Sequence, residues 1–499
     1  MPRVPSWGHR MVRSLSALVF TLLFVPAATA AEPKPVVSVL LWFDTEDYIL
    51  PASDDAALKV ADWLTKEEIK ATFKVVGEKA RTLEKRDRKD VIAALSKHEI
   101  GYHSNYHSVQ PTPAMYLSAL GWDEGVAEFD RREKPGYDVV KRVFGQAPTC
   151  YGQPGSSWGP QSYGAMRRWK MPMYLDSGSH VGLDRKPLYF GGVFTVYHHE
   201  HTLRTDLGGD KDVEKAEARF VEARRKILAD GGGLVSIYYH PCEFVHRQFW
   251  DGANFSKGAN PPRERWVKPG AKTPEESKTA YESFFAYIRF IKRFADVRFV
   301  TASEAAAMYR DTAADREFTP DTIRTIAERA VKELDFQRHD GYALAPSEVL
   351  YLLNEFVAGQ RPKAVKLPPT PFGPSEPPRA MPASVITDAS QFARTADDVA
   401  DYLRKHGRVP STVWLGSTAV TPEAYLAAVA KVVLATADGK PLPESIELKP
   451  ATLLTTKCVQ DDNPKLWGWV IFPPDFRAPA MMELAKRQAW TIKPAVLRP

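Results

Sequence analysis

The stretch VVSVLLWFDTEDY, residues 36–48, joins a run of apolar and β-branched residues to three acids within four positions. Such a run predicts a buried strand, and Asp44, Glu46 and Asp47 stand at its carboxyl end. In parallel α/β proteins, functional side chains gather at the carboxyl ends of the strands. These acids are therefore candidates for catalysis or metal binding.

The chain alternates short β-rich runs with helical patterns from about residue 35 to residue 310. This alternation predicts parallel strands with helices outside them. About seven or eight such units favour a barrel over an open sheet. The expected strands are 36–43, 71–77, 99–104, 148–153, 173–177, 194–198, 233–240 and 297–302.

Three histidines extend the candidate site. His103 and His107, in GYHSNYHS, lie four residues apart just past an expected strand. Two histidines and one carboxylate leave open coordination positions, which is typical of a catalytic zinc or a similar divalent metal. His240 ends the most apolar strand, LVSIYYH, where a titratable side chain suits proton transfer.

Together these motifs resemble the polysaccharide deacetylase superfamily, the chitooligosaccharide deacetylase-like carbohydrate esterases of family 4. The resemblance rests on FDTEDY, KATFKVVG, HSNYH and YYHP, which occur in the family's order and spacing. It implies an α/β fold, a distorted (β/α)7-type barrel, over residues 31–312. It also implies hydrolysis of the N-acetyl groups of a polysaccharide such as peptidoglycan or a chitin-like polymer.

The resemblance assigns roles to individual residues. Asp44 falls on the general base and His240 on the general acid. His103 and His107 would bind a divalent metal, most simply Zn²⁺, together with an acid for which Glu46 and Asp47 compete. In YLDSGS, Asp176 is expected to assist His240.

One motif departs from the family pattern. An arginine usually orients the base from an R-x-P-G-like stretch, but YGQPGSSWG has Gly152 or Gln153 in that place. The orienting role is therefore vacant or moved. A non-catalytic polysaccharide-binding protein is the rival hypothesis, and hydrolysis of a non-sugar amide is the third.

Substrate contacts are expected from Gln153 and from two aromatic residues, Tyr106 and Trp158. Aromatic faces suit the apolar face of a pyranose ring, so these two are candidates for stacking on the N-acetylated glycan.

The ends of the chain have other compositions. Residues 1–30 show a basic, then apolar, then small-residue pattern that predicts a signal peptide, and hence a secreted, periplasmic or cell-surface protein. No later segment is apolar and long enough for an integral membrane span. The formal net charge of +6 is too mild to indicate nucleic-acid binding.

The region after the barrel is expected to hold a smaller, mainly helical C-terminal module. The boundaries expected from composition are a helical extension (313–366), a Pro-rich linker (367–383) and the module itself (384–499). KHGRVPSTVWLG followed by PEAYLAAVA resembles pseudomurein-binding repeats. That resemblance implies cell-wall attachment through the module.

Overall fold

A computed structural model describes residues 34–498, and the predicted signal peptide, residues 1–30, lies outside this range. Each of the eight runs predicted as strands contains a strand. Most of their residues are buried on both faces, as expected for parallel strands covered by helices. These strands are β1 (Val37–Thr45), β2 (Thr72–Val75), β3 (Glu99–Tyr102), β4 (Cys150–Tyr151), β5 (Met173–Leu175), β7 (Val193–Val196), β9 (Gly233–Tyr239) and β10 (Val297–Val300).

One mainly parallel sheet joins these strands in the order β19-β6-β7-β5-β4-β3-β2-β1-β9-β8, in which β6 spans Leu188–Phe190. The long strand β1 is central: β9 pairs with one side, while β10 and β2 pair with successive halves of the other. The predicted α/β barrel class is confirmed. Within residues 34–498 the sheet ends at β8 (Thr202–Leu203) and β19 (Lys493–Pro494), so the barrel is open.

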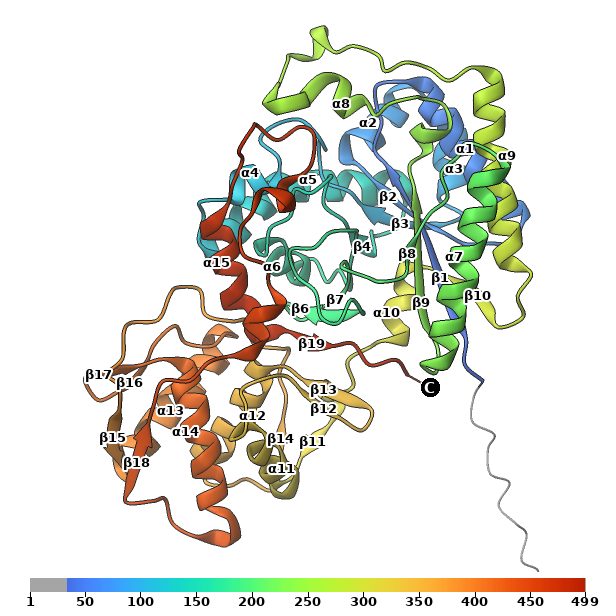
Figure 1. Ribbon diagram of the computed structural model, residues 1–499. Coiled ribbons are helices and arrows are strands. Elements are labelled where there is room, and N and C mark those ends of the chain that lie inside the picture. The colour runs from blue at the N-terminus through green and yellow to red at the C-terminus, as the bar shows by residue number, and fades with distance from the viewer. Residues whose placement is uncertain (1–33, 499) are drawn as a thin grey trace, which may run out of the picture. The chain divides into compact units, whose positions relative to one another are not determined.

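Helices accompany the strands on the outside of the sheet (Figure 1). Those of the barrel region are α1 (Pro51–Lys66), α2 (Gly77–Lys85), α3 (Lys89–Leu95), α4 (Pro113–Leu117), α5 (Trp122–Phe144), α6 (Gln161–Arg168), α7 (Asp210–Ala229), α8 (Trp250–Phe255), α9 (Pro274–Lys292) and α10 (Ala302–Met308). Among the described residues, no helix is both long and apolar enough to cross a membrane.

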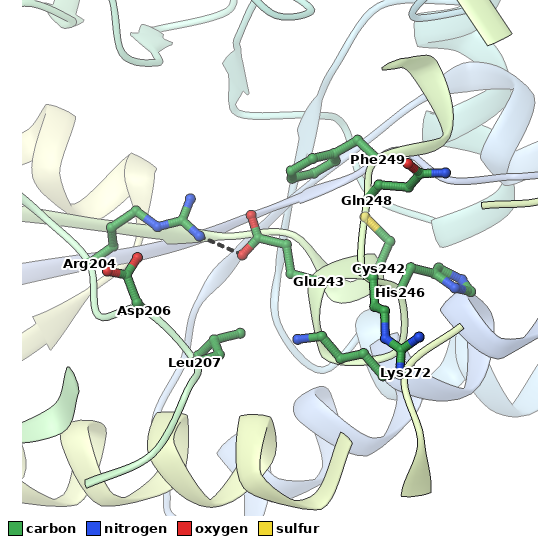
Figure 2. A pocket seen from close by; sticks show the side chains of 10 residues that line it. Arg204, Asp206, Leu207, Cys242, Glu243, His246, Gln248, Phe249 and Lys272 are labelled. Atoms are coloured by element: carbon green, nitrogen blue, oxygen red, sulfur yellow. Dashed lines mark hydrogen bonds and ion pairs between the residues drawn. The ribbon is translucent and has the colours of Figure 1, made fainter. Parts of the chain in front are cut away.

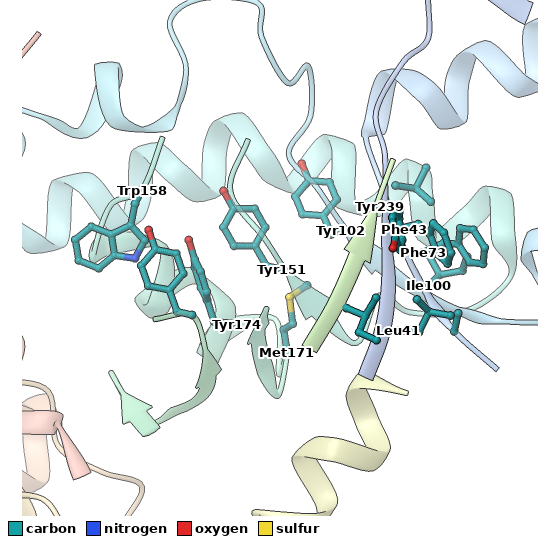
Figure 3. Close-up of a cluster of buried hydrophobic side chains, with 14 of the residues drawn as sticks. Leu41, Phe43, Phe73, Ile100, Tyr102, Tyr151, Trp158, Met171, Tyr174 and Tyr239 are labelled. Atoms are coloured by element: carbon teal, nitrogen blue, oxygen red, sulfur yellow. The ribbon is translucent and has the colours of Figure 1, made fainter. Parts of the chain in front are cut away.

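The alternation of side chains along each strand separates two environments. In β1, Leu41 and Phe43 pack in the core between sheet and helices, where Phe43 stacks on Phe73 with ring centroids 4.7 Å apart (Figure 3). Leu40 and Trp42 belong to a second cluster on the opposite face of the strand. Because the period is two, Asp44 lies on that inner face.

A separate hydrophobic cluster lies within residues 313–453 and Trp490. It includes residues of four helices and of short antiparallel strand pairs, which follow the barrel region in the chain. These elements are α11 (Pro320–Ala330), α12 (Pro346–Ala358), α13 (Ala389–His406), α14 (Pro422–Ala435), β11 (Glu317–Phe318), β12 (Gln337–His339), β13 (Tyr342–Leu344), β14 (Val365–Lys366), β15 (Val385–Asp388), β16 (Val413–Leu415), β17 (Thr418–Val420) and β18 (Ser445–Leu448).

The last part of the chain returns to the barrel core. Trp467, Phe472 and Met481 pack in the barrel's main cluster, and β19 pairs antiparallel with β6 (Leu188–Phe190). Met481 belongs to the helix α15 (Pro479–Arg487), which precedes β19 in the sequence. Residues 35–499 form one compact unit, and the four-part division expected from composition stays a prediction.

Candidate active site

A cavity of about 750 Å³ lies at the carboxyl ends of the parallel strands. Many of the residues that line it follow or end β1, β3, β4, β5 and β9, and others come from the loop after β9 and from the C-terminal segment. Most of the sequence-predicted candidates meet there: Asp44, Glu46, His103, His107, Gln153, Asp176 and His240.

Glu46, His103 and His107 form a group in which one ligand atom from each lies within 4.8 Å of the others. His107 Nε2 is 2.8 Å from Glu46 Oε2, and His103 Nε2 is 3.7 Å from the same oxygen. Ser104 and His107 both have φ near +60°, and the turn they make brings the two imidazole rings to 5.0 Å. The sharp turn in HSNYH thus converts sequence spacing into a shared site.

The imidazole nitrogens and the carboxylate of this group are ligands that suit a divalent metal such as zinc. His103 Nδ1 lies 3.0 Å from the main-chain oxygen of Gly152, an acceptor only, so Nδ1 carries the proton and Nε2 is free as a ligand. His107 Nε2 is buried, and its 2.8 Å contact with Glu46 Oε2 does not have the direction of a hydrogen bond, so among residues 34–498 it has no hydrogen-bond partner. Burial by itself would raise the pKa of Glu46, but His107 and His103 outweigh it and lower this pKa well below its usual range.

Asp47, the competing acid, lies elsewhere. Its carboxylate accepts hydrogen bonds from the Ile49 main-chain N–H at 2.8 Å and from the Ser53 hydroxyl at the start of α1. The structure therefore brings Glu46, and not Asp47, to the two histidines. Asp47 instead satisfies main-chain donors at the amino end of the helix.

Asp44 is buried, with 4% of its surface exposed. Its Oδ1 is 2.9 Å from Lys74 Nζ and 3.4 Å from His103 Nδ1, and its Oδ2 is 3.7 Å from His240 Nε2. Burial alone would raise the pKa of Asp44, but the charges of His103, Lys74 and His240 outweigh it and lower this pKa. The carboxylate is therefore ionised at neutral pH.

Asp44, His103 and Asp176 also have ligand atoms within 4.8 Å of one another. The Lys74 ammonium, however, lies 2.9 Å from Asp44 and 2.8 Å from Asp176. A metal ion beside it would meet a fixed positive charge. The group built on Glu46 is thus the better candidate for a metal.

His240 is held by a residue that the motifs did not predict. Its Nδ1 lies 2.8 Å from Glu243 Oε1, and Arg204 donates to Glu243 Oε2 at 2.6 Å (Figure 2). Burial alone would lower the pKa of His240, but Glu243 and then Glu46 and Asp44 raise it to about 9. The expected helper, Asp176, forms its hydrogen bonds with Lys74 and the Ser177 N–H.

The three expected substrate-binding residues lie in different environments. Gln153 lines the cavity and donates to the Gly155 main-chain oxygen at 3.1 Å. Tyr106 is 48% exposed and lines a neighbouring hollow. Trp158 is fully buried and stacks on His180 with ring centroids 5.1 Å apart, so the structure does not bring it to the cavity.

Other aromatic residues line the cavity instead. Tyr238 precedes His240 on β9, Phe249 comes from the loop after it, and Trp469 comes from the C-terminal segment. The Trp469 indole N–H donates to Asp251 Oδ2 at 2.7 Å, and its ring lies 5.3 Å from that of His107. The aromatic cluster LWGWV was the only sequence signal for Trp469.

No protein-family model matches the sequence, and no curated protein matches it significantly. Among solved structures, the chain is similar to a protein of Mycobacterium smegmatis provisionally named a polysaccharide deacetylase. The identity is 13%, the TM-score is 0.37, and the match covers 56% of this chain and 91% of the other.

Two further similar structures are of the CE4 family that the sequence motifs resemble. One is the CE4 domain of a multidomain xylanase from the hindgut metagenome of Trinervitermes trinervoides, at 14% identity and TM-score 0.30, covering 55% and 90% of the two chains. The other is a CE4 family pseudoenzyme from Bacillus anthracis, at 13% identity and TM-score 0.29, covering 54% and 65%. These values are too low to assign a reaction to this chain.

Proposed function

We propose that this chain is a metal-dependent deacetylase that hydrolyses the N-acetyl groups of a polysaccharide such as peptidoglycan or a chitin-like polymer. The observation that carries the proposal is the convergence of three parts in one cavity. These parts are the group of Glu46, His103 and His107, the separate buried carboxylate of Asp44, and the imidazole of His240.

Glu46, His103 and His107 would hold the divalent metal, with zinc as the first expectation. When bound, such a metal lowers the pKa of a water molecule and polarises an amide carbonyl. The Nδ1 atom of His103 is already hydrogen-bonded to the Gly152 main-chain oxygen. This hydrogen bond sets which nitrogen faces the metal group.

Asp44 accepts the proton of the attacking water in this reaction. Its ionised state suits a base, and it lies close to, but outside, the metal group: Oδ1 is 3.4 Å from His103 Nδ1. A carboxylate bound to its own metal would be a weaker base, because the metal's charge would oppose protonation.

His240 donates a proton to the departing nitrogen as the C–N bond of the N-acetyl group breaks. Its pKa of about 9 keeps the imidazole protonated at neutral pH, and Glu243 on Nδ1 points Nε2 toward Asp44. Acetate and a free amino sugar are the products. One residue therefore takes a proton and another gives one on the same side of the cavity.

The cavity suits a sugar ring. Its volume of about 750 Å³ is within the usual range for small-ligand sites. Tyr238, Phe249 and Trp469 give it three aromatic side chains among polar ones, which is the surface that the apolar face of a pyranose prefers.

The test is acetate release from N-acetylated chitooligosaccharides and from peptidoglycan, with and without a chelator. We expect release by the wild type, its loss with the chelator, and its recovery on adding zinc. Asp44→Asn should be inactive, whereas Asp296→Asn, which removes a carboxylate paired with Arg224 away from the cavity, should match the wild type. Polymer binding without acetate release at any metal loading would support the non-catalytic alternative instead.

The proposal includes export to the periplasm or cell surface, supported by the signal pattern in residues 1–30. It also includes cell-wall attachment through residues 384–499, supported by the repeat-like motif alone. Fractionation of cells that express the full chain tests the first, and cosedimentation of the protein with purified cell wall tests the second.

A further inference from the structure

We propose that Lys74 is the positioning residue for Asp44, and that it fixes this carboxylate from inside the barrel. The inference rests on the proposed function, in which Asp44 is the base. Lys74 is not itself a catalytic residue, because its side chain is fully buried and does not line the cavity.

The sheet register places the two residues side by side. Asp44 at the end of β1 pairs with Lys74 of β2 in parallel register. Phe73 and Val75 pack in the core between sheet and helices, so alternation sends the Lys74 side chain to the inner face with Asp44. A charged residue there stands in a strand whose other residues are wholly buried.

The ammonium has three polar neighbours: two accept a hydrogen bond from it and the third, Asp44, forms an ion pair with it. Lys74 Nζ donates to Asp176 Oδ2 at 2.8 Å and to the Leu175 main-chain oxygen at 2.9 Å, and it lies 2.9 Å from Asp44 Oδ1. It also lies 4.1 Å from the centre of the Trp42 ring, a cation–π contact. Because Leu175 ends β5 and Asp176 follows it, these two contacts fix the ammonium in place, and the ammonium in turn fixes Asp44.

Two glycines make the space for this side chain. A Cβ on Gly101 would lie 2.8 Å from Lys74 Cγ, and a Cβ on Gly152 would overlap Lys74 Nζ, the Asp176 carboxylate and the Leu175 main-chain oxygen. Neither glycine has a positive φ, so space and not backbone conformation explains them. Lys74 can therefore take this position only because residues 101 and 152 have no side chain.

The charges also require the lysine. Asp44 and Asp176 are both buried, and without a cation between them the two carboxylates would repel each other. Burial alone would lower the pKa of Lys74, but Asp176 and Asp44 outweigh it and raise this pKa. The lysine thus stays charged and supplies the orienting contact at the place where YGQPG lacks an arginine.

The experiment compares Lys74→Met with Lys493→Met. Lys493 is the matched control, since it is also buried and also bridges two carboxylates, those of Asp311 and Glu348, away from the cavity. We expect Lys74→Met to lower kcat for acetate release about 100-fold with KM changed less than threefold, because a base displaced by about 1 Å loses this much. Lys493→Met should lower Tm and leave kcat within threefold of the wild type.

Gly152→Ala should also lower kcat, because the added Cβ would overlap Lys74 Nζ, the Asp176 carboxylate and the Leu175 main-chain oxygen. If Lys74→Met does not fold, Lys74→Met/Asp176→Asn removes one of the unpaired charges with the lysine. The kcat of this double variant is then compared with that of Asp176→Asn.

Two results would overturn the inference while leaving the proposed function intact: a kcat of Lys74→Met within threefold of an active wild type, or equal losses in both lysine variants. If the wild type releases no acetate, the proposed function fails. Thermal unfolding of the variants then still tests the contact between Lys74 and Asp44. Lys74→Met and Asp44→Asn should then be non-additive in their effects on Tm, and additive effects would overturn the inference.

Discussion

Replacing Glu243 by glutamine removes the negative charge that keeps a proton on His240. The glutamine keeps the size of the side chain, so the cavity changes little in shape. The charge matters because the Glu243 carboxylate lies 2.8 Å from His240 Nδ1 and is the largest of the influences that raise the pKa of the imidazole to about 9. Without it, we expect this pKa to fall toward the ordinary value of 6.5.

The size of the effect follows from the protonated fraction of His240. At pH 8 this fraction is about 0.9 for a pKa of about 9 and about 0.03 for a pKa of 6.5, so kcat should fall about 30-fold. At pH 6 both forms are mostly protonated, and the defect should shrink to less than about twofold.

The assay is the pH profile of kcat for acetate release between pH 5.5 and 9.5. The alkaline limb of the Glu243→Gln profile should move to lower pH by up to about 2.5 units. Glu348→Gln, which changes a buried glutamate paired with Lys493 outside the cavity, should leave it unmoved. A defect of the same size at every pH would refute the reasoning, because it would mean that Glu243 does not set the charge of His240.

Three further predictions concern the metal, the substrate and the stability of the fold. Glu46→Ala should abolish binding of one zinc equivalent, as measured by metal analysis. Asp47→Ala should keep the metal and lose about 1 kcal/mol of unfolding free energy in denaturant titration, because it removes the hydrogen bonds at the start of α1. Equal metal loss in both variants would contradict this assignment. Trp469→Ala should raise KM for a chitooligosaccharide about three- to tenfold with metal content unchanged, and an unchanged KM would exclude its contact with the sugar. Burial lowers the pKa of His180 to about 3, so between pH 6.5 and 3 only the unfolded chain binds a proton at this residue. The unfolding free energy should therefore fall as pH falls through this window, by about 1.4 kcal/mol per pH unit. In His180→Phe, denaturant titration at a series of pH values should show a shallower dependence of the unfolding free energy on pH.

The strands and the main site residues could be predicted because their signals are local. A run of apolar β-formers predicts a buried strand wherever it occurs, and all eight such runs contain strands. The period of two along β1 then decides that Asp44 faces inward once Phe43 packs against the helices. His103 and His107 share a turn of five residues, so their nearness also needs no long-range information.

The expectations that depended on distant contacts fared differently. Trp158 is a plausible sugar-stacking residue in sequence, but it is buried beside His180. Asp176 was expected beside His240 and is instead bonded to Lys74, 102 residues earlier in the chain. Whether Glu46 or Asp47 joins the histidines depends on where α1 begins, since Ser53 in its first turn donates to the carboxylate of Asp47.

The sequence by itself determined the kind of chain this is: buried parallel strands, with acids and histidines at their carboxyl ends, follow from local composition and period. Only the tertiary structure decided the partners of those groups. Lys74 meets Asp44 across a strand pair, Arg204 reaches Glu243 from 39 residues away, and Trp469 joins Asp251 from 218 residues away. The physical reason is that a buried charge or indole N–H must find a partner in space, and the fold, not the order of residues, sets which one is within reach.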